Sequence, residues 1–217
     1  MFDLRCKSSV AYSVSMSSSR SPITRNGIAL EALALIDEAG LEALSMRKLG
    51  GRLGIEAMSL YNHVRNKSDL LDAVHELLLA RLVLGADVSD WAQMARQVAC
   101  SFLALLRAHP NTIPLFAKRS ATAPGSLQVV DHCIGQLLLA GFSAEESLML
   151  FQVVFCFVIG HATFHYTPRP ADSYASAQAY ARFPALAQLG APDRCAPEAE
   201  FEFGLTAILR GVASARN

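Results

Sequence analysis

The sequence predicts an all-α protein in which a small N-terminal unit of three short helices precedes a larger helical domain. Apolar residues recur at the three- and four-residue spacing of a helix in segment after segment. Nowhere does a convincing run alternate apolar and polar residues, as a half-buried strand would. The chain has 217 residues, of which 52% are hydrophobic and 18% are charged, and this composition excludes a disordered protein.

Apolar stripes mark most of the expected helices in chain order, and they lie at 28–39, 70–81, 94–106, 127–138 and 201–212. Gly40 and Gly141 follow two of these stripes as helix-stop residues. The stripe at 127–138 consists of Leu127, Val130, Ile134, Leu137 and Leu138. Five of the nine prolines fall between residues 168 and 197, so we expect mainly loop there, with one short helix near 173–182.

A further expected helix contains no Asp, Glu, Lys or Arg from residue 147 to residue 168. Ser143, followed by Glu146, supplies a capping-box start for this helix. Its length just suffices to span a bilayer, but polar residues interrupt it and no Lys/Arg cluster flanks it. We therefore expect no membrane partner and a helix buried on all sides, either inside the protein or in a dimer interface.

The overall charge is balanced, with 19 Lys+Arg against 19 Asp+Glu, which argues against a uniformly basic surface but leaves a local basic patch open. The five cysteines are scattered without a CxxC pair, so we expect reduced thiols in the cytoplasm and no zinc site. Residues 1–20 are broken by serines and predict a flexible tail, with Met1 and Met16 both open as the true start. We expect domains at 21–68 and 69–217.

Residues 45–67 predict two short helices, 45–53 and 57–64, that cross at a tight turn. Ser45 can cap the first helix, and Gly54 permits the positive φ that a sharp turn between helices requires. Five apolar residues can face one shared core and fix the second helix across the first: Leu49, Leu53, Ile55, Leu60 and Val64. The pattern is that of a helix-turn-helix, in which the second helix enters the major groove of DNA.

The same segment carries a local net charge of +4, because Glu56 alone opposes five basic residues, Arg47, Lys48, Arg52, Arg65 and Lys67. A basic face on such a helix pair is typical of a DNA-binding surface. From the pattern alone a solvated basic helix pair on an ordinary helical bundle also remains open.

Several motifs resemble those of a known family. Ala34–Gly40, Leu44–Gly50 and Leu60-Tyr-Asn-His-Val64 followed by Asn66-Lys-Ser-Asp-Leu-Leu71 look like the N-terminal DNA-binding domain of TetR-type transcriptional regulators. A weaker similarity to the tetracycline-repressor-like C-terminal domain rests on Leu106–Pro110, Ala140–Ser143 and Phe201–Gly211. The resemblance implies a ligand-responsive DNA-binding regulator, a repressor that binds a palindromic operator and is released by a small apolar effector.

The resemblance also implies roles for individual residues. Arg47 would contact a guanine edge or a phosphate, and Tyr61 and His63 would reach phosphate oxygens. Alternatively, Tyr61 packs against the turn between the helices and His63 is a solvated surface residue. Ala57 and Met58 stand where tetracycline repressors carry a glutamine and a proline, so the operator of that family is not carried over. The expected DNA-contacting residues are Arg47, Lys48, Ala57, Met58, Ser59, Tyr61, Asn62, His63 and Lys67.

The second domain is expected to bind the effector and to form a homodimer, because phosphate contacts carry little sequence information and specificity needs two half-sites. The expected pocket residues, which would otherwise be plain core, are Phe102, Leu106, Leu115, Phe116, Phe151 and Phe155. The expected interface residues, which would otherwise form an intramolecular core, are Phe157, Gly160, His161, Phe164, Phe201, Leu205, Ile208 and Val212.

We expect no cofactor and no metal. Tetracycline repressors hold a magnesium–drug chelate through a histidine and a glutamate. The resemblance implies that Leu115 and Phe164 occupy those positions here, and neither side chain can bind a hard cation. His161 and His165 lie one helical turn apart and supply half of a metal site, but no third ligand follows at matching spacing, so they are interpreted as a polar patch in a pocket or an interface.

No catalytic grouping of residues is recognisable, so we do not expect an enzyme. The alternatives left open are a helical small-molecule-binding protein without DNA binding and, with less support, an enzyme on an all-helical scaffold.

Overall fold

The computed structural model describes residues 23–85, 90–168, 177–189 and 196–216, and every regular element in these ranges is helical. The all-α prediction is confirmed for this part of the chain. The expected tail at 1–20 lies outside the described residues, and so does the part of the expected helix near 173–182 that precedes residue 177. Two short helices follow in that stretch, α9 (Ala177–Tyr180) and α10 (Pro184–Leu189).

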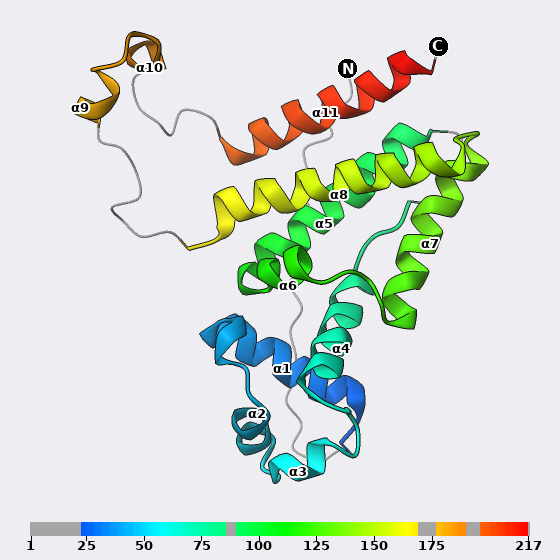
Figure 1. Cartoon of the computed structure of the whole chain (residues 1–217), viewed down its shortest axis with the longest axis vertical. Coiled ribbons are helices and arrows are strands. Elements are labelled where there is room, and N and C mark those ends of the chain that lie inside the picture. Colours follow the sequence, from blue (N-terminus) through cyan, green and yellow to red (C-terminus); the bar gives the residue numbers. More distant parts are fainter. Residues whose placement is uncertain (1–22, 86–89, 169–176, 190–195, 217) are drawn as a thin grey trace.

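The N-terminal unit consists of α1 (Arg25–Ala39), α2 (Met46–Leu53) and α3 (Ala57–Leu60), with a short 3-10 turn, η1 (Leu41–Ala43), between α1 and α2. It forms the lower end of the molecule in Figure 1. Gly40 ends α1 with a φ of 84°, as the sequence predicts. The side chains enclosed between these helices include Ile28, Ile36, Leu44, Leu49, Leu60 and Val64.

Helix α4 (Lys67–Leu79) connects this unit to the rest of the molecule. Its buried face packs against α1 at one end and against α7 (Pro124–Leu139) at the other. Arg25, at the start of α1, donates to Asp69 Oδ1 at 2.9 Å and to Glu76 Oε2 at 2.8 Å, and this ties α1 to α4 at two points about two helical turns apart. A displacement of α4 would therefore move the N-terminal unit with it.

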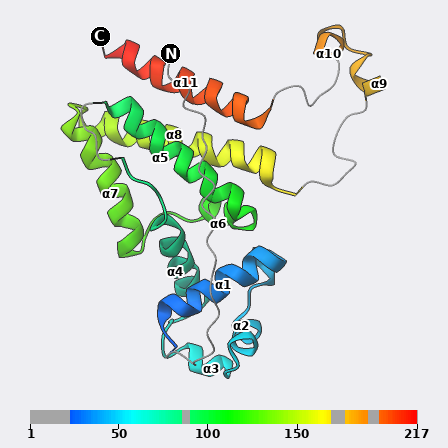
Figure 2. The same ribbon diagram turned by 180° about the vertical axis from the view of Figure 1, so that it is seen from behind.

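The C-terminal region contains α5 (Trp91–Ala108), η2 (Pro110–Thr112), α6 (Ile113–Lys118), α7, α8 (Ala144–Tyr166) and α11 (Pro197–Ala215). Helix α8 packs against α5, α6, α7 and α11. In both views α8 and α11 run side by side at the end of the molecule opposite α3 (Figures 1 and 2). The core between these helices includes Phe102, Leu106, Leu115, Leu150, Val158 and Leu205.

Two of the helical expectations need correction. The second helix of the pair is shorter than 57–64, because the backbone after Leu60 turns, with the N–H of Tyr61 donating to the Met58 carbonyl at 3.1 Å. On α7 the expected stripe residue Leu137 is buried, but Leu127 and Leu138 are about half exposed, and Ser126 and Cys133 are buried as well. Apolar residues surround most of α7, so the sequence could not show which of its faces would be covered.

The capping box predicted at the start of α8 is present, since Ser143 and Glu146 each accept a hydrogen bond from the other's backbone N–H. Helix α8 is not buried on all sides within one chain, and the alternative expectation, burial in a dimer interface, stays a prediction. Met149, Val153 and Phe164 are each at least half exposed. By length and composition alone α8 could cross a membrane. In the described part of the chain it packs one face against four helices, and apolar side chains of the opposite face are exposed.

Candidate nucleic-acid interface and ligand cavity

The turn between α2 and α3 has the geometry that the sequence predicts. Ser45 Oγ accepts a hydrogen bond from the Lys48 N–H at 3.3 Å, and Gly54 adopts a left-handed φ of 69°. Gly50 is a contributor that the sequence analysis missed, because a Cβ there would lie 2.9 Å from the Ile55 carbonyl oxygen. The backbone of α2 thus touches the start of α3, and this contact fixes how the two helices cross.

Most of the side chains expected to contact DNA are exposed at this end of the molecule. Met58 is 72% exposed and Tyr61 is 44% exposed, although both are large and partly apolar. Ala57 is half-buried where α3 begins. The exposed members of the expected set are Arg47, Lys48, Met58, Ser59, Tyr61, Asn62, His63 and Lys67. The structure brings them to one end, and their contacts with DNA stay a prediction.

The charge of this surface differs from the sequence count. Arg52 forms ion pairs with Glu31 at 2.9 Å and with Glu38 at 2.5 Å, so its charge is neutralised within the N-terminal unit. These carboxylates come from α1, more than a dozen residues away in sequence, which is why spacing could not reveal the pairing. No ion pair among the described residues engages Arg47 or Lys48, and these two cations remain for an anionic partner.

The start of α4 adds a further cationic position. Asn66 Oδ1 accepts a hydrogen bond from the Asp69 N–H at 2.9 Å and so caps the helix. The hydrogen bond from the Arg65 N–H, together with the Arg25 guanidinium, holds the pKa of Asp69 below its usual range. Lys67 is exposed in this first turn, where the positive end of the helix dipole also favours anions.

A cavity of about 520 Å³ opens among α4, α5, α7 and α8. Four of the six expected pocket residues line it: Phe102, Phe116, Phe151 and Phe155. Phe102 stacks on Phe155 with the ring planes 7° apart and meets Phe116 edge to face. The other two expected residues, Leu106 and Leu115, do not line the cavity, because neighbouring side chains enclose them and leave at most 1% of either exposed.

His75 is a polar cavity residue that the sequence analysis missed. It is 4% exposed, its Nδ1 lies 2.8 Å from Ser126 Oγ, and its ring packs on Phe116 with 4.6 Å between the centroids. Burial lowers the pKa of His75, so the imidazole is neutral near pH 7. Its Nε2 has no hydrogen-bond partner within the described chain. A histidine within the apolar stripe of 70–81 was the signal that could have found it.

Basic side chains complete the cavity wall. Lys118 and Arg119 line it, and the described lining contains no Asp or Glu. Arg119 also donates to Asp72 Oδ1 at 2.5 Å and to Ser68 Oγ at 2.9 Å, and so links the cavity wall to the first turns of α4. Arg119 therefore contacts the same helix that carries Lys67.

Leu115 and Phe164, the positions assigned by resemblance to a magnesium chelate, do not line this cavity. Leu115 is buried in the core, and Phe164 is 56% exposed on the outer face of α8. The lining itself offers no carboxylate for a hard cation.

The expected dimer-interface residues divide into two groups. His161, Phe201 and Leu205 are at most 7% exposed and belong to the contact between α8 and α11 of one chain, so they are not available to a second copy. Phe157, Ile208 and Val212 are half-buried, and a Cβ on Gly204 would lie 2.6 Å from the Phe157 ring. Gly160 and Phe164 face outward, and so does Phe203, which the sequence analysis missed and which is 79% exposed.

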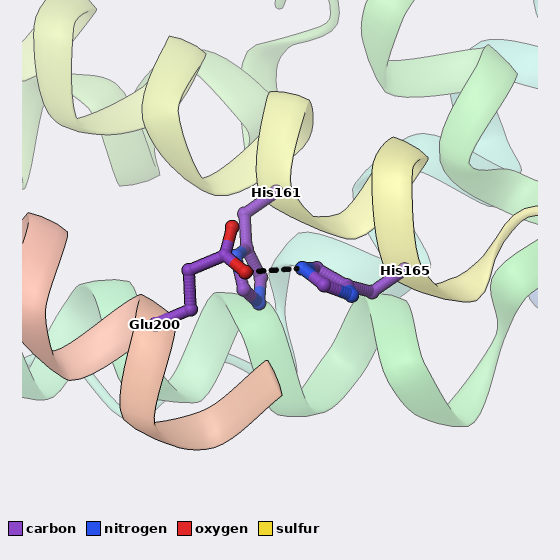
Figure 3. A group of neighbouring side chains, drawn as sticks. All are labelled: His161, His165 and Glu200. Atoms are coloured by element: carbon purple, nitrogen blue, oxygen red, sulfur yellow. Dashed lines mark ion pairs between the residues drawn. The ribbon is translucent and has the colours of Figure 1, made fainter. Parts of the chain in front are cut away.

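Sequence spacing offered no third metal ligand beside His161 and His165, but the structure places one next to them. Glu200, in the first turn of α11, places its carboxylate 3.2 Å from His165 Nε2 (Figure 3). Sequence spacing could not show this, since 35 residues separate His165 from Glu200 and the fold brings them together.

Comparisons with known proteins agree with this architecture. Residues 28–74 match the family described as bacterial regulatory proteins, tetR family, and residues 84–216 match the tetracyclin repressor-like C-terminal domain. The chain is 32% identical over 199 residues to the tetracycline repressor protein class A from transposon 1721 of Escherichia coli, and the match covers 88% of this chain and 91% of that protein.

Solved structures are similar over nearly the whole chain. The Streptomyces coelicolor TetR family protein ActR in complex with actinorhodin superposes with a TM-score of 0.78 at 26% identity, covering 90% of this chain and 99% of that one. A possible TetR family transcriptional regulator from Streptomyces coelicolor A3(2) gives a TM-score of 0.72 at 30% identity, covering 88% and 99%. With both domains matched in order and the helix-turn-helix in place, the chain belongs to the TetR family of bacterial regulators.

Proposed function

We propose that this protein is a ligand-responsive transcriptional repressor that binds a palindromic operator as a homodimer and leaves it when an effector occupies the cavity. The observation that carries the proposal is that α4 bears both Lys67, at the helix-turn-helix, and His75, in the cavity wall. One rigid helix thus connects a surface suited to DNA with an enclosed space suited to a small molecule. The proposal includes no catalytic step and places the protein in the cytoplasm, with its DNA.

DNA recognition is proposed to combine two kinds of contact. Arg47, Lys48 and Lys67 would neutralise phosphates, and Tyr61 and His63 would hydrogen-bond to phosphate oxygens. The other exposed positions at the start of α3 would face base edges in the major groove. Because Met58 is apolar and 72% exposed, it suits a thymine methyl better than a polar base edge.

The homodimer is proposed to cover the exposed faces of α8 and α11. Met149, Val153, Gly160 and Phe164 follow one another at helical spacing along α8, and Phe203 projects from the neighbouring α11. A Cβ at Gly160 would meet nothing within 4 Å, so a partner helix can approach closely there. An apolar face of this kind, running along two long helices, is typical of a protein–protein interface.

The effector is proposed to be largely apolar and flat, with an acidic or hydrogen-bonding group at one end. Stacked phenylalanines form one wall of the cavity, whereas His75 offers an unpartnered Nε2, and Lys118 and Arg119 offer positive charge. The ActR structure, which is similar over 90% of this chain, is a complex with actinorhodin, which supports a small-molecule effector here.

Release from DNA is proposed to follow from the position of Arg119. An acidic effector group would compete with Asp72 and Ser68 for the guanidinium, and α4 would then shift relative to α6. The shift changes the spacing of the two helix-turn-helix units in the dimer. The effector lowers DNA affinity only as far as it binds the shifted state more tightly than the DNA-bound state.

The test is binding of the purified protein to a labelled DNA fragment from around its own gene, with Tyr61→Ala/Lys67→Ala as the variant. We expect the variant to lose sequence-selective binding while it sediments as the same dimer as the wild type. Unchanged binding by the variant, or equal affinity of the wild type for unrelated DNA, would contradict the proposal.

A further inference from the structure

Three side chains that could ligate a metal converge between the C-terminal end of α8 and the first turn of α11. His161 and His165 come from successive turns of α8, and Glu200 faces them from α11 (Figure 3). One ligand atom from each of the three residues lies within 4.8 Å of the others. None of the three residues lines the large cavity, so the cluster is separate from the proposed effector site.

The Nε2 atoms of both imidazoles are buried without a hydrogen-bond partner in the described chain. His161 is 7% exposed, and its Nε2 makes no hydrogen bond with any described residue. His165 Nε2 lies 3.2 Å from Glu200 Oε2 but is not aligned to hydrogen-bond with it. Since buried polar atoms are nearly always satisfied, two unpaired nitrogens beside a carboxylate point to a bound group that the protein chain does not supply.

The neighbouring charges leave Glu200 available for that group. Glu198, a second carboxylate in the first turn of α11, is held by Arg107 at 2.8 Å. The Phe201 ring packs against His161 edge to face, with 5.2 Å between its centroid and that of the imidazole. A simple ion pair between His165 and Glu200 would leave His161 unexplained.

We propose that His161, His165 and Glu200 bind a transition-metal cation of the zinc class. Imidazole nitrogens with one carboxylate oxygen suit Zn²⁺, whereas Mg²⁺ and Ca²⁺ require mostly oxygen ligands. With bonds of about 2.0–2.1 Å, ligand atoms around a tetrahedral zinc ion lie about 3.4 Å apart, so the cluster has to close only slightly from 4.8 Å. Part of this movement can come from Glu200, because its side chain is 48% exposed.

The bound ion joins the end of α8 to the start of α11. Three protein ligands leave a fourth position for water or a further ligand. Because the same two helices present the exposed faces proposed for dimerisation, the ion stiffens the support of that interface. Metal binding does not depend on operator DNA or on the effector, so this inference and the proposed function can fail separately.

The test measures zinc uptake by full-length protein that was first treated with EDTA and then dialysed against buffered free zinc. We expect one zinc ion per chain in the wild type. Loss of a ligand in Glu200→Gln or His165→Gln is expected to weaken binding by at least the roughly 10–100-fold that loss of an outer-shell partner costs. Glu198→Gln is the matched control, because it removes a carboxylate from the same turn of α11 but outside the cluster, and it should bind as the wild type does.

Two further measurements keep the test independent of folding defects. Glu200→His retains a zinc ligand and is expected to restore uptake that Glu200→Gln loses. Zinc at about 100 times its Kd should raise the Tm of the wild type by about 5–10 °C, and the shift should vanish in His165→Gln. Zinc bound equally by Glu200→Gln, His165→Gln and Glu198→Gln, or no stoichiometric zinc in the wild type, would overturn the proposal.

Discussion

The salt dependence of DNA binding distinguishes cations that face DNA from those neutralised within the protein. Each helix-turn-helix presents Arg47, Lys48 and Lys67 to a partner, whereas Arg52 is engaged by Glu31 and Glu38. A dimer thus offers six cations, and at about 0.9 counterions released per phosphate contact the slope of log K against log[salt] is about −5.4. Raising the salt from about 50 to 200 mM should then weaken operator binding by about 2,000-fold.

Lys67→Gln removes two of these contacts per dimer, so the slope should fall in magnitude by about 1.8, to about −3.6, and the loss over the same salt range should be about 150-fold. Arg52→Gln removes the same formal charge from the same segment but should leave the slope unchanged. Its exposed ion pairs contribute little to stability, so the variant is expected to fold. Fluorescence anisotropy at four or more salt concentrations measures both slopes. Equal reductions for Lys67→Gln and Arg52→Gln would refute the assignment of the DNA-facing charges.

Three further predictions concern the turn, the cavity histidine and the cavity volume. Gly50→Ala forces a Cβ to within 2.9 Å of a backbone oxygen and should abolish operator binding, whereas Gly51→Ala, which meets nothing within 4 Å, should preserve binding in the same anisotropy assay. Because burial lowers the pKa of His75, protonation of this imidazole opposes folding. The free energy of unfolding is therefore highest above the pKa of about 6.5 that histidine has in the unfolded chain, and it decreases as the pH falls below that value. Urea unfolding at pH 7.5 and 5.5 should show a steeper loss for the wild type than for His75→Gln, and equal losses would contradict this reasoning. Ala95→Phe projects a ring into the cavity and should reduce binding of an apolar dye such as ANS without weakening operator binding; unchanged dye binding would argue against this cavity as the ligand site.

Local sequence signals predicted local structure well. The helix stop at Gly40, the turn at Gly54 and the capping box at Ser143 were all found, because each depends on backbone geometry within four residues. The spacing of apolar residues likewise located the main helices. The length of α3 was overestimated, because nothing in residues 57–64 marks the turn that follows Leu60.

Features that depend on tertiary contacts were not accessible from the sequence. The neutralisation of Arg52 and the approach of Glu200 to His165 each join residues far apart in the chain. The outer face of α8 could not be identified either, since this helix is apolar all round and its exposed side is set by which helices happen to pack on it. Four of the six residues expected in the pocket line the cavity. Apolar residue type alone could not distinguish these four from Leu106, which is enclosed in the core.

The most direct test of the central claim is the footprint and stoichiometry of the complex with DNA from around the protein's own gene. We predict two chains bound to one two-fold symmetric site, with protected half-sites about one helical turn, or a multiple of it, apart. We also predict that protection is lost when a ligand that occupies the cavity is added. A single chain per site, or protection that shows no sequence preference, would contradict the account.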